Sequence, residues 1–340
     1  MEVNVDSIIL GIETSCDETS AAVVKNGKDV LSNVISSQID IHKKYGGVVP
    51  EVASRKHLEM IIEVIDIAIN EAGINKKDLT AIGVTNQPGL IGALLVGITA
   101  AKGLSISLDI PIIPVHHLRG HIYANLVEHE LNDFPILALV VSGGHTSLAI
   151  WHNHLDIEVI GHTLDDAAGE AFDKIARKLG LDYPGGPEIE KYASIGSRTN
   201  LLFPVAKLGK NNYNFSFSGL KSNVINYLNK MKAQGNEIIV EDVAFAVQDA
   251  IASAVIEKVL IASKNYGIKK VVLGGGVTSN RYLIEKLEEN GNKIGLEVYY
   301  PKGILCTDNG VMIGSAAYYL SQYGIEGDLF LNAYSSGDIK

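Results

Sequence analysis

Two histidines have the residue type and the spacing of a metal-ligand pair. His117 and His121 lie in the run VHHLRGH, which follows Pro114. If Pro114 begins a helix, the four-residue spacing places both imidazoles on one helical face, where two neutral nitrogens can bind one divalent ion. The spacing alone is weak evidence, because ten histidines in 340 residues often form such a pair by chance. Solvated or core histidines are the simpler interpretation until a third ligand is found.

Asp308 is the natural third ligand. It lies where the last helix of the chain is expected to begin, and a helix N-terminus favours a carboxylate. The simpler interpretation is that Asp308 caps that helix, as Asp commonly does. Together, His117, His121 and Asp308 would supply two imidazoles and one carboxylate with open coordination positions, a set suited to iron or zinc acting on a substrate oxygen.

A metallopeptidase and a cysteine enzyme are alternative interpretations of these residues. A zinc peptidase of the His-Glu-x-x-His type needs a glutamate directly after the first histidine, and here Leu118 follows His117. Cys16 and Cys306 have no neighbouring histidine in sequence, and a buried structural cysteine is the commoner state. Both catalytic patterns are therefore incomplete.

Three turns have the composition of phosphate-binding turns. Residues 14–19, 142–147 and 274–280 each follow an apolar stretch and are rich in Gly, Ser or Thr. Free N–H groups and hydroxyls in such turns can hold phosphate oxygens without a lysine, although hairpins use the same residue types. A Walker P-loop is excluded, because neither Gly-Lys-Ser nor Gly-Lys-Thr occurs. Three such turns in one chain favour a nucleotide held between two lobes.

The elements that must position these residues occur twice in the same order. In the first half, apolar patterning predicts strands at 7–13, 20–25, 30–36, 79–85 and 111–115, with helices from Pro50 to Gly73 and over 89–108. The pattern restarts after Asp133 with a strand at 136–141, a glycine turn and a strand at 147–151. Alternating strands and helices predict an α/β fold with parallel or mixed sheets, built from two related units.

The remainder of the second half alternates in the same way. We expect a helix over 165–181, a sharp loop at 182–187, an irregular excursion at 198–218, helices over 219–231 and 240–265, a strand at 269–273, a helix over 280–289, a strand at 296–300 and a last helix after 306–310.

Segment 89–108 is the one candidate for a membrane span. Because it contains Lys102 and several glycines and serines, we expect a buried core helix and no membrane.

Composition restricts the class of partner and the compartment. The formal net charge is −10, so the overall field does not attract nucleic acid, which is bound by Lys and Arg displacing counterions from phosphates. A nucleic-acid role therefore needs a local basic patch or a basic partner. Two cysteines cannot form a disulfide framework, and the acidic N-terminus resembles no secretory signal, so the cytoplasm is expected.

Several longer motifs carry a family resemblance. They are GIETSCDET from Gly11, YGGVVPE from Tyr45, HHLRGH from His116, VSGGHT from Val141, and the segments 165–174, 182–187, 215–221 and 306–310. On these motifs the chain resembles the universal tRNA N6-threonylcarbamoyladenosine transferase family, and its run FSFSGLK is similar to the bacterial branch. The resemblance covers nearly the whole chain.

The resemblance implies a two-lobed actin-like, Hsp70-like ATPase (ASKHA) fold. Such a fold has duplicated βββαβα-type units and a nucleotide cleft between the lobes, consistent with the repeated pattern above. One lobe would cover 1–132, with the C-terminal helix near 309–325 packing back on it. The other would cover 133–308 and include the excursion at 198–218.

The resemblance also implies site residues. His117, His121 and Asp308 match the family's metal ligands, with Fe²⁺ favoured and Zn²⁺ as the alternative. The implied substrate-binding positions are Val140, Val141, Ser142, Gly143, Gly144, Asp173, Gly186, Glu190 and Asn280, and Glu190 stands where relatives often have Asp. Asp17 and Glu18 match acidic residues near the reaction centre.

The implied reaction transfers the threonylcarbamoyl group from threonylcarbamoyl-AMP to N6 of the adenosine 3′ of the tRNA anticodon. The metal would hold the threonyl end, the glycine turns would hold the adenine nucleotide (threonylcarbamoyl-AMP, AMP or ATP), and Asp17 would orient the amine or take its proton. A second reading, of a different class, is a non-catalytic nucleotide-binding partner with the same fold.

The implied partners explain how an acidic protein could act on tRNA. They are a paralogous non-catalytic subunit of the same fold, a small P-loop ATPase and an upstream enzyme that makes threonylcarbamoyl-AMP. We expect the isolated chain to bind tRNA weakly, through a local patch that includes Lys174, Arg177, Lys178 and Lys221.

Two positions depart from the family pattern. Asn86-Gln87-Pro88-Gly89 stands where most relatives have a Gly-Pro pair before Gly-Leu, so we expect the geometry of this loop to differ. Arg119 lies between the two candidate histidine ligands. We expect it to face solvent, with contact to an anionic substrate as the alternative.

Overall fold

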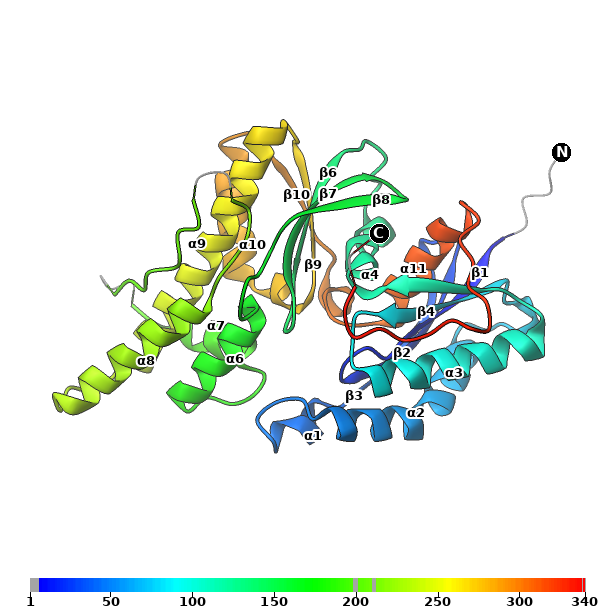
Figure 1. Cartoon of the computed structure of the whole chain (residues 1–340), viewed down its shortest axis with the longest axis horizontal. Helices are drawn as coiled ribbons and strands as arrows, with labels where there is room; N and C mark the ends of the chain where they lie inside the picture. The colour runs from blue at the N-terminus through cyan, green and yellow to red at the C-terminus, as the bar shows by residue number, and fades with distance from the viewer. Residues whose placement is uncertain (1–5, 198–200, 210–211, 338, 340) are drawn as a thin grey trace. The chain divides into compact units, whose positions relative to one another are not determined.

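The chain forms two compact units, each built on its own five-stranded sheet (Figure 1). The structure is a computed structural model that describes residues 6–197, 201–209, 212–337 and 339. One unit contains Met1–Phe134, His152–Ile157 and Pro301–Lys340, and the other contains Pro135–Trp151 and Glu158–Tyr300. Residues 301–308, including Asp308, therefore belong to the first unit.

The sheet of the first unit brings three strand ends to one edge. Its order is β3-β2-β1-β4-β5, with β1 Ile8–Glu13, β2 Glu18–Lys25, β3 Asp29–Ser37, β4 Ala81–Gln87 and β5 Ile112–His116. β2 pairs antiparallel with both β1 and β3, whereas β4 runs parallel to β1 and to β5. Since β1, β4 and β5 run in the same direction, Glu13, Gln87 and His116 end at the same edge of the sheet.

Helices cover both faces of this sheet (Figure 1). α2 (Pro50–Glu71) and α3 (Ile91–Leu108) pack on one face, and α11 (Gly310–Ser321) packs on the other beside α4 (His117–Tyr123). The shorter elements of the unit are α1 Ile39–Lys43, α5 Asn125–Glu128 and the 3₁₀ turns η1 Lys76–Asp78 and η3 Gly303–Cys306. As predicted, α2 begins at a proline and is closed by Gly73, which has a positive φ of 67°.

The expectation of a buried core helix at 89–108 is only partly met. α3 packs on α2 and β4 and buries Ala93, Leu94, Gly97, Ile98 and Ala101. Much of its remaining apolar surface is solvent-exposed, including Ile106 at 67%. By length and composition α3 could cross a membrane, and no other helix among the described residues meets that test. The sequence shows no helical period that would distinguish its two faces, which is why the exposed side was missed.

The second unit repeats the topology of the first. Its sheet has the order β10-β9-β6-β7-β8, with β6 Ile136–Val141, β7 Thr146–Asn153, β8 Asp156–His162, β9 Lys270–Gly274 and β10 Glu297–Tyr299. β6 pairs antiparallel with β7 and parallel with β9, as β1 does with β2 and β4. In both sheets the first three strands form a meander, and the fourth and fifth join the edge next to the first. The duplicated α/β fold predicted from the sequence is confirmed.

The helices of the second unit lie on one side of its sheet (Figure 1). They are α6 Ala168–Leu179, α7 Gly185–Ala193, α8 Ser218–Ala233, α9 Val240–Tyr266 and α10 Arg281–Asn292, with the 3₁₀ turn η2 Gly276–Ser279. Together with the sheet they enclose a core that includes Leu139, Phe172, Ile189, Val247 and Leu287.

Two expectations in this unit need comment. The loop predicted at 182–187 is wrong beyond residue 184, because α7 begins at Gly185. Gly and Pro indicate turns, but Pro187 lies in the first helical turn, where the missing N–H costs no hydrogen bond. Of the excursion at 198–218, residues 198–200 and 210–211 lie outside the described residues. The described stretches 201–209 and 212–217 contain no helix.

Candidate metal centre and anion-binding turns

The two candidate histidine ligands lie in the first turns of α4. The strand predicted at 111–115 continues to His116, and the helix begins at His117 and not at Pro114. The side chain of His116 caps α4 by accepting a hydrogen bond from the N–H of Leu118, and its Nε2 lies 3.1 Å from the carbonyl of Gly337. His116 thus has a structural role. His117 and His121, which follow it at helical spacing, face the edge of the sheet.

Close packing of α11 against β1 fixes Asp308. A Cβ on Gly11 would lie 2.1 Å from the carbonyl oxygen of Gly310, so only glycine permits this approach. The N–H of Gly310 also donates to the hydroxyl of Ser20. The helix is capped by Asn309, whose side chain accepts from the N–H of Met312. The simpler interpretation of Asp308 as the cap is therefore wrong.

His117, His121 and Asp308 come together in the first unit. One potential ligand atom from each residue lies within 4.8 Å of the others. Oδ1 of Asp308 is 3.1 Å from Nε2 of His121 and 3.5 Å from Nε2 of His117. Ligand atoms about 2.0–2.2 Å from a zinc ion are roughly 3.3–3.6 Å apart when the coordination is tetrahedral. The two distances from Asp308 match this separation, so the cluster could hold one ion.

The polar atoms of His121 support the same interpretation. The side chain is fully buried, and neither ring nitrogen makes a hydrogen bond to another described residue. The contact with Asp308 is short, but it does not have hydrogen-bond geometry. A buried imidazole with unsatisfied nitrogens is costly unless it binds an ion or a ligand. The donor set fits a divalent metal.

Glu13 is a site residue that the sequence reasoning missed. Its fully buried carboxylate lies 3.0 Å from Nδ1 of His117 and accepts a hydrogen bond from the hydroxyl of Thr85. A proton on Nδ1 leaves Nε2 of His117 free to bind a metal, which is the usual arrangement of a carboxylate behind a ligand histidine. An ionisable residue at the end of an otherwise apolar strand is the signal that could have identified it.

The two partners shift each other's pKa. Burial would raise the pKa of Glu13, but the charge and the hydrogen bond of His117 hold it below its ordinary value. Burial opposes protonation of His117, but the negative charges of Asp308 and Glu13 raise its pKa to about 9.

Asp17 lies in the turn between β1 and β2, and Glu18 is the first residue of β2. Burial, together with the charges of Asp17 and Asp308, raises the pKa of Glu18 well above its ordinary value. Burial and the same acidic neighbours also raise the pKa of the Cys16 thiol, so Cys16 is a poor nucleophile, as expected. The Asp308 charge acts on both residues, which places this acidic turn near the candidate ligands.

The buried side chain of His57, on α2, holds this turn in place. Nδ1 of His57 is 2.7 Å from the hydroxyl of Thr19, and Nε2 is 3.0 Å from the carbonyl of Cys16. Burial lowers the pKa of His57, so the neutral ring donates to the carbonyl and accepts from the hydroxyl. One imidazole therefore bridges both ends of the segment that carries Asp17 and Glu18.

The expectation for Arg119 is wrong. Its side chain is 2% exposed and is among the largest fully buried side chains of the described chain. Nη1 of Arg119 donates to the carbonyl of His154 at 2.6 Å. The position looked like a solvent-facing site because a charged residue inside a short helix is usually exposed.

In the second unit, two of the predicted phosphate-type turns lie side by side. β6 leads into Ser142-Gly143-Gly144, and the parallel strand β9 leads into Gly275. Gly275 has a φ of +92°, and a Cβ there would lie 2.5 Å from the carbonyl of Val141. The exposed Gly143 and Gly144 donate no amide hydrogen bond to another described residue. These amides are free to hold an anion.

The strand residues proposed for this site have no exposed side chains. The side chains of Val140 and Val141 are buried in the sheet. The N–H of Gly169, at the start of α6, donates to the carbonyl of Ser142, and the N–H of Ala168 donates to the hydroxyl of Thr146. The N-terminus of α6 therefore packs directly against the glycine turn, which adds a positive helix end to it.

The remaining predicted residues anchor neighbouring helices. Oδ1 of Asp173 accepts from the N–H of Gly185, next to Gly186, which lies in open space. Asn280 caps α10 and donates to Gln248, whereas Glu190 accepts from the N–H of Arg281.

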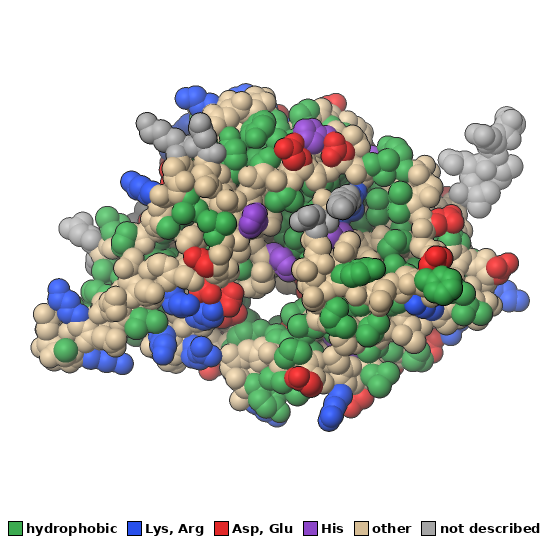
Figure 2. All heavy atoms as spheres, in the orientation of Figure 1, with side chains coloured by type: hydrophobic (Ala, Val, Ile, Leu, Met, Phe, Trp, Pro, Cys, Tyr) green, Lys and Arg blue, Asp and Glu red, His purple; other side chains and the backbone are tan. Residues whose placement is uncertain are grey.

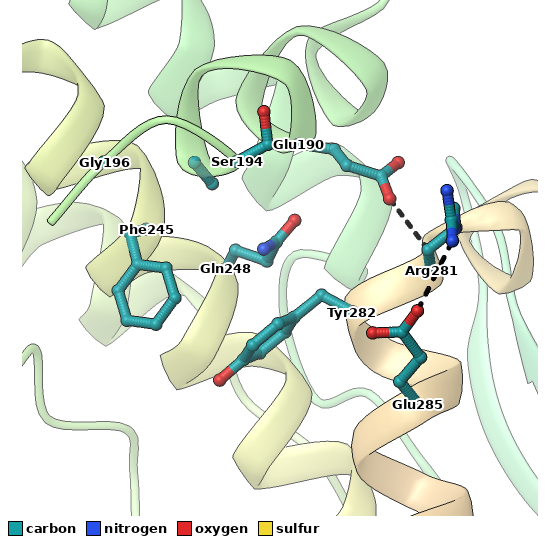
Figure 3. A pocket seen from close by; sticks show the side chains of 9 residues that line it. Glu190, Ser194, Gly196, Phe245, Gln248, Arg281, Tyr282 and Glu285 are labelled. Carbon is teal, nitrogen blue, oxygen red and sulfur yellow. Dashed lines mark hydrogen bonds and ion pairs between the residues drawn. The ribbon is translucent and has the colours of Figure 1, made fainter. Parts of the chain in front are cut away.

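Beside Glu190 lies a pocket of ≈ 280 Å³ whose lining also includes Gln248, Arg281, Tyr282 and Phe245 (Figure 3). An aromatic wall with amide and charged groups is suited to a polar ring system.

The basic residues proposed for tRNA binding lie on α6 and α8, where Lys and Arg side chains gather with acidic ones beside them (Figure 2). Lys174 and Lys221 both form 2.7 Å ion pairs with Asp166. Arg177 and Lys178 are exposed. Two of the four cations are therefore largely neutralised within the chain.

Solved structures define the fold class. The chain resembles full-length HypF in its phosphate- and nucleotide-bound form, with a TM-score of 0.63 and 17% identity over 96% of this chain and 57% of that chain. It also resembles component A of the (R)-2-hydroxyglutaryl-CoA dehydratase of Acidaminococcus fermentans, with a TM-score of 0.56 and 16% identity over 92% and 97% of the two chains. The chain thus has an α/β fold of the actin-like (ASKHA) type, and it carries a potential metal-ligand set.

Closer relatives define the family. A model of the TsaD family, tRNA N6-adenosine threonylcarbamoyltransferase, matches residues 29–315. Curated proteins of that name from Staphylococcus epidermidis and Clostridium beijerinckii are 52% and 53% identical to this chain, over 98% and 96% of each sequence. The chain belongs to the tRNA N6-adenosine threonylcarbamoyltransferase family.

Proposed function

We propose that this chain transfers the threonylcarbamoyl group from threonylcarbamoyl-AMP to N6 of the adenosine 3′ of the anticodon, in tRNAs that read codons beginning with A. The observation that carries the proposal is the near-complete match to transferases of this name. The presence of His117, His121 and Asp308 at ligand separation supports it further.

We assign the metal to His117, His121 and Asp308, with Fe²⁺ favoured and Zn²⁺ as the alternative. When bound, the ion would supply Lewis-acid stabilisation of negative charge on a substrate oxygen. The chain's own contribution is to hold these ligands: Glu13 orients His117, and the close contact of Gly11 with Gly310 holds the start of α11 beside β1.

We assign proton transfer to the acidic turn of the first unit. The N6 amine attacks the carbamoyl carbon, a C–N bond forms, the bond from that carbon to the phosphate oxygen breaks, and AMP leaves. The amine loses one proton, and Asp17 is the acceptor we propose. Glu18, whose pKa is raised, keeps its proton to higher pH than an ordinary glutamate and is therefore the poorer acceptor.

We assign the adenylate to the turns of the second unit. The free amides of Gly143 and Gly144 and the N-terminus of α6 supply donors for its phosphate. Asp173, Gly186, Glu190 and Asn280 surround the adjoining region, and the pocket beside Glu190 has room for a nucleoside.

The alternative functions account for fewer of these features. A non-catalytic nucleotide-binding subunit has no need of a buried two-histidine, one-carboxylate set. A zinc peptidase of the His-Glu-x-x-His type needs a glutamate directly after the first histidine, and Leu118 occupies that position here.

We further propose that the chain works in the cytoplasm with tRNA, a paralogous non-catalytic subunit, a P-loop ATPase and a threonylcarbamoyl-AMP synthase. The net charge of −10 and the pairing of Lys174 and Lys221 with Asp166 support a need for partners in tRNA binding.

Reconstitution tests these assignments. Purified chain, the partner proteins, threonine, bicarbonate, ATP and unmodified tRNA are combined, and the modified nucleoside is quantified by mass spectrometry. We expect product from the wild-type chain, and a loss of at least about a hundredfold together with loss of bound metal in His121→Ala. Omitting each partner in turn measures its contribution.

An exposed histidine provides a matched control, because His162→Ala removes an imidazole far along the chain from the proposed ligands. It should retain wild-type turnover and metal content. If the wild-type chain yields no product with all partners present, the transferase assignment is wrong. If His121→Ala retains full turnover, the metal assignment is wrong.

A further inference from the structure

One turn of the first unit contacts both helices associated with the proposed metal ligands. His154 lies in the segment His152–Ile157 of this unit. Its ring stacks on Tyr319 of α11, with centroids 4.6 Å apart and an interplanar angle of 6°. Its backbone carbonyl accepts a hydrogen bond from Arg119 of α4. Because α4 carries His117 and His121 and α11 directly follows Asp308, His154 connects the supports of all three ligands.

Arg119 and Tyr123 hold His154 from the same face of α4. Nη1 of Arg119 is 2.6 Å from the His154 carbonyl oxygen, and the hydroxyl of Tyr123 donates to the same oxygen at 3.0 Å. The two residues are four positions apart, so their side chains lie on one side of the helix. Two donors from successive turns therefore converge on a single acceptor.

An aromatic enclosure fixes the ring of His154. Beyond the stack on Tyr319, Phe134 meets the ring edge-on at a centroid distance of 5.3 Å, and Tyr123 lies at 5.6 Å. Such offset and edge contacts restrict the ring to one orientation. The carbonyl that Arg119 binds is therefore held in a defined place relative to α11.

α4 and α11 are also in direct contact, so a displacement of either is transmitted to the other. A Cβ on Gly120 would lie 2.8 Å from Cδ1 of Ile313, and the hydroxyl of Ser315 is 3.4 Å from the carbonyl of Tyr123.

A buried guanidinium such as that of Arg119 contributes little net stability, because its desolvation offsets its hydrogen bonds. Its bonds are directional, however, and they specify orientation.

We propose that Arg119 is a positioning residue for the metal centre. Its hydrogen bond to His154 fixes the rotation of α4 relative to α11, and this sets the separation of the His117 and His121 nitrogens from the Asp308 carboxylate. Arg119 is two residues from each histidine, so a rotation of the helix about its axis moves both ligands together. This inference rests on the metal centre proposed above.

Metal binding to the isolated full-length chain tests the inference. Affinity for Zn²⁺ is measured by competition with a chromophoric chelator, and the ligand geometry is monitored by the visible spectrum of the Co²⁺-loaded chain. We expect Arg119→Met to weaken Zn²⁺ binding about tenfold and to alter the Co²⁺ spectrum, as for substitutions behind metal ligands. Arg119→Lys, which keeps a donor, should recover part of the affinity. Arg55→Met, on the exposed surface of α2, should bind as wild type.

Thermal unfolding of the same samples separates positioning from folding. Tyr123→Phe removes the hydroxyl that lies 3.0 Å from both the carbonyl oxygen and Nδ1 of His154 but leaves the Arg119 side chain in place. It should weaken Zn²⁺ binding by a smaller factor, which provides a test even if Arg119→Met does not fold. Folded Arg119→Met or Tyr123→Phe with wild-type affinity and a wild-type Co²⁺ spectrum would overturn the inference alone. A wild-type chain that binds neither ion would remove the metal centre and the inference with it.

Discussion

Glu13 determines which nitrogen of His117 can bind a metal. Its carboxylate is fully buried at the end of β1, where it faces Nδ1 of His117 at 3.0 Å and accepts from the hydroxyl of Thr85. The charge of Glu13 makes His117 a stronger donor toward a cation, and its hydrogen bond keeps Nε2 directed at Asp308. The residue therefore acts on the ligand set without belonging to it.

Replacing Glu13 by glutamine tests this role. Glu13→Gln keeps the shape but removes the charge, so we expect affinity for Zn²⁺ to fall by roughly 10–100-fold. Chelator competition on the purified chain measures the change, and Glu63→Gln on the exposed face of α2 is the matched control. Unchanged affinity in a folded Glu13→Gln chain would show that the carboxylate does not support His117.

The candidate ligand residues could be proposed from sequence, but their surroundings could not. The spacing of His117 and His121 follows from helix geometry, and the family motifs singled out Asp308. The burial of Arg119 depends on His154, which is distant in sequence, and no local pattern indicates that contact. The contact of Glu13 with His117 was missed for the same reason, because the two residues are distant in sequence.

At the scale of elements, one carboxylate that forms ion pairs with two lysines joins α6 to α8. Asp166, just before α6, pairs with Lys174 of α6 and with Lys221 of α8. Burial would raise the pKa of Asp166, but its hydrogen bonds with both lysines lower it to about 2. The folded pKa is below the ordinary value of 3.8, so the pair stabilises the fold above pH 4 and loses its contribution as pH falls toward 2.

Removing this carboxylate should have a pH-dependent effect. A shift from 3.8 to about 2 corresponds to about 2 kcal/mol. We expect Asp166→Asn to lower the free energy of unfolding by up to that amount at pH 7, and the difference from wild type to shrink as pH falls from 4 toward 2. Urea unfolding at several pH values measures both. A difference that is independent of pH would mean that the ion pairs do not contribute in this way.

Long elements with a clear period were predicted well, and exceptions have local causes. α2 and α9 match their expected ranges closely, because apolar residues recur at helical spacing. α7 was missed because its first residues are Gly-Gly-Pro, and the exposure of α3 was missed because its apolar residues surround the helix. The cap of α11 moved by one residue, from Asp308 to Asn309.

At the scale of the whole molecule, the internal duplication gives the candidate ligands related positions. α4, with His117 and His121, follows β5, and Asp308 follows β10. These strands are the fifth in their respective sheets, next to β4 and β9. The repeat was predictable from the sequence because strand–turn–strand patterns recur, whereas the assignment of 301–308 to the first unit depends on contacts far apart in the chain.

The most direct test of the proposed activity asks whether the acceptor is the N6 amine. Two transcripts of one tRNA, with adenosine or inosine 3′ of the anticodon, are incubated with this chain, its partner proteins and threonylcarbamoyl-AMP labelled in the threonyl group. Inosine lacks the amine but is otherwise similar in shape. We predict label in the adenosine transcript alone, recovered as the modified nucleoside and dependent on this chain. Equal labelling of both transcripts, or none of the adenosine transcript, would contradict the proposed function.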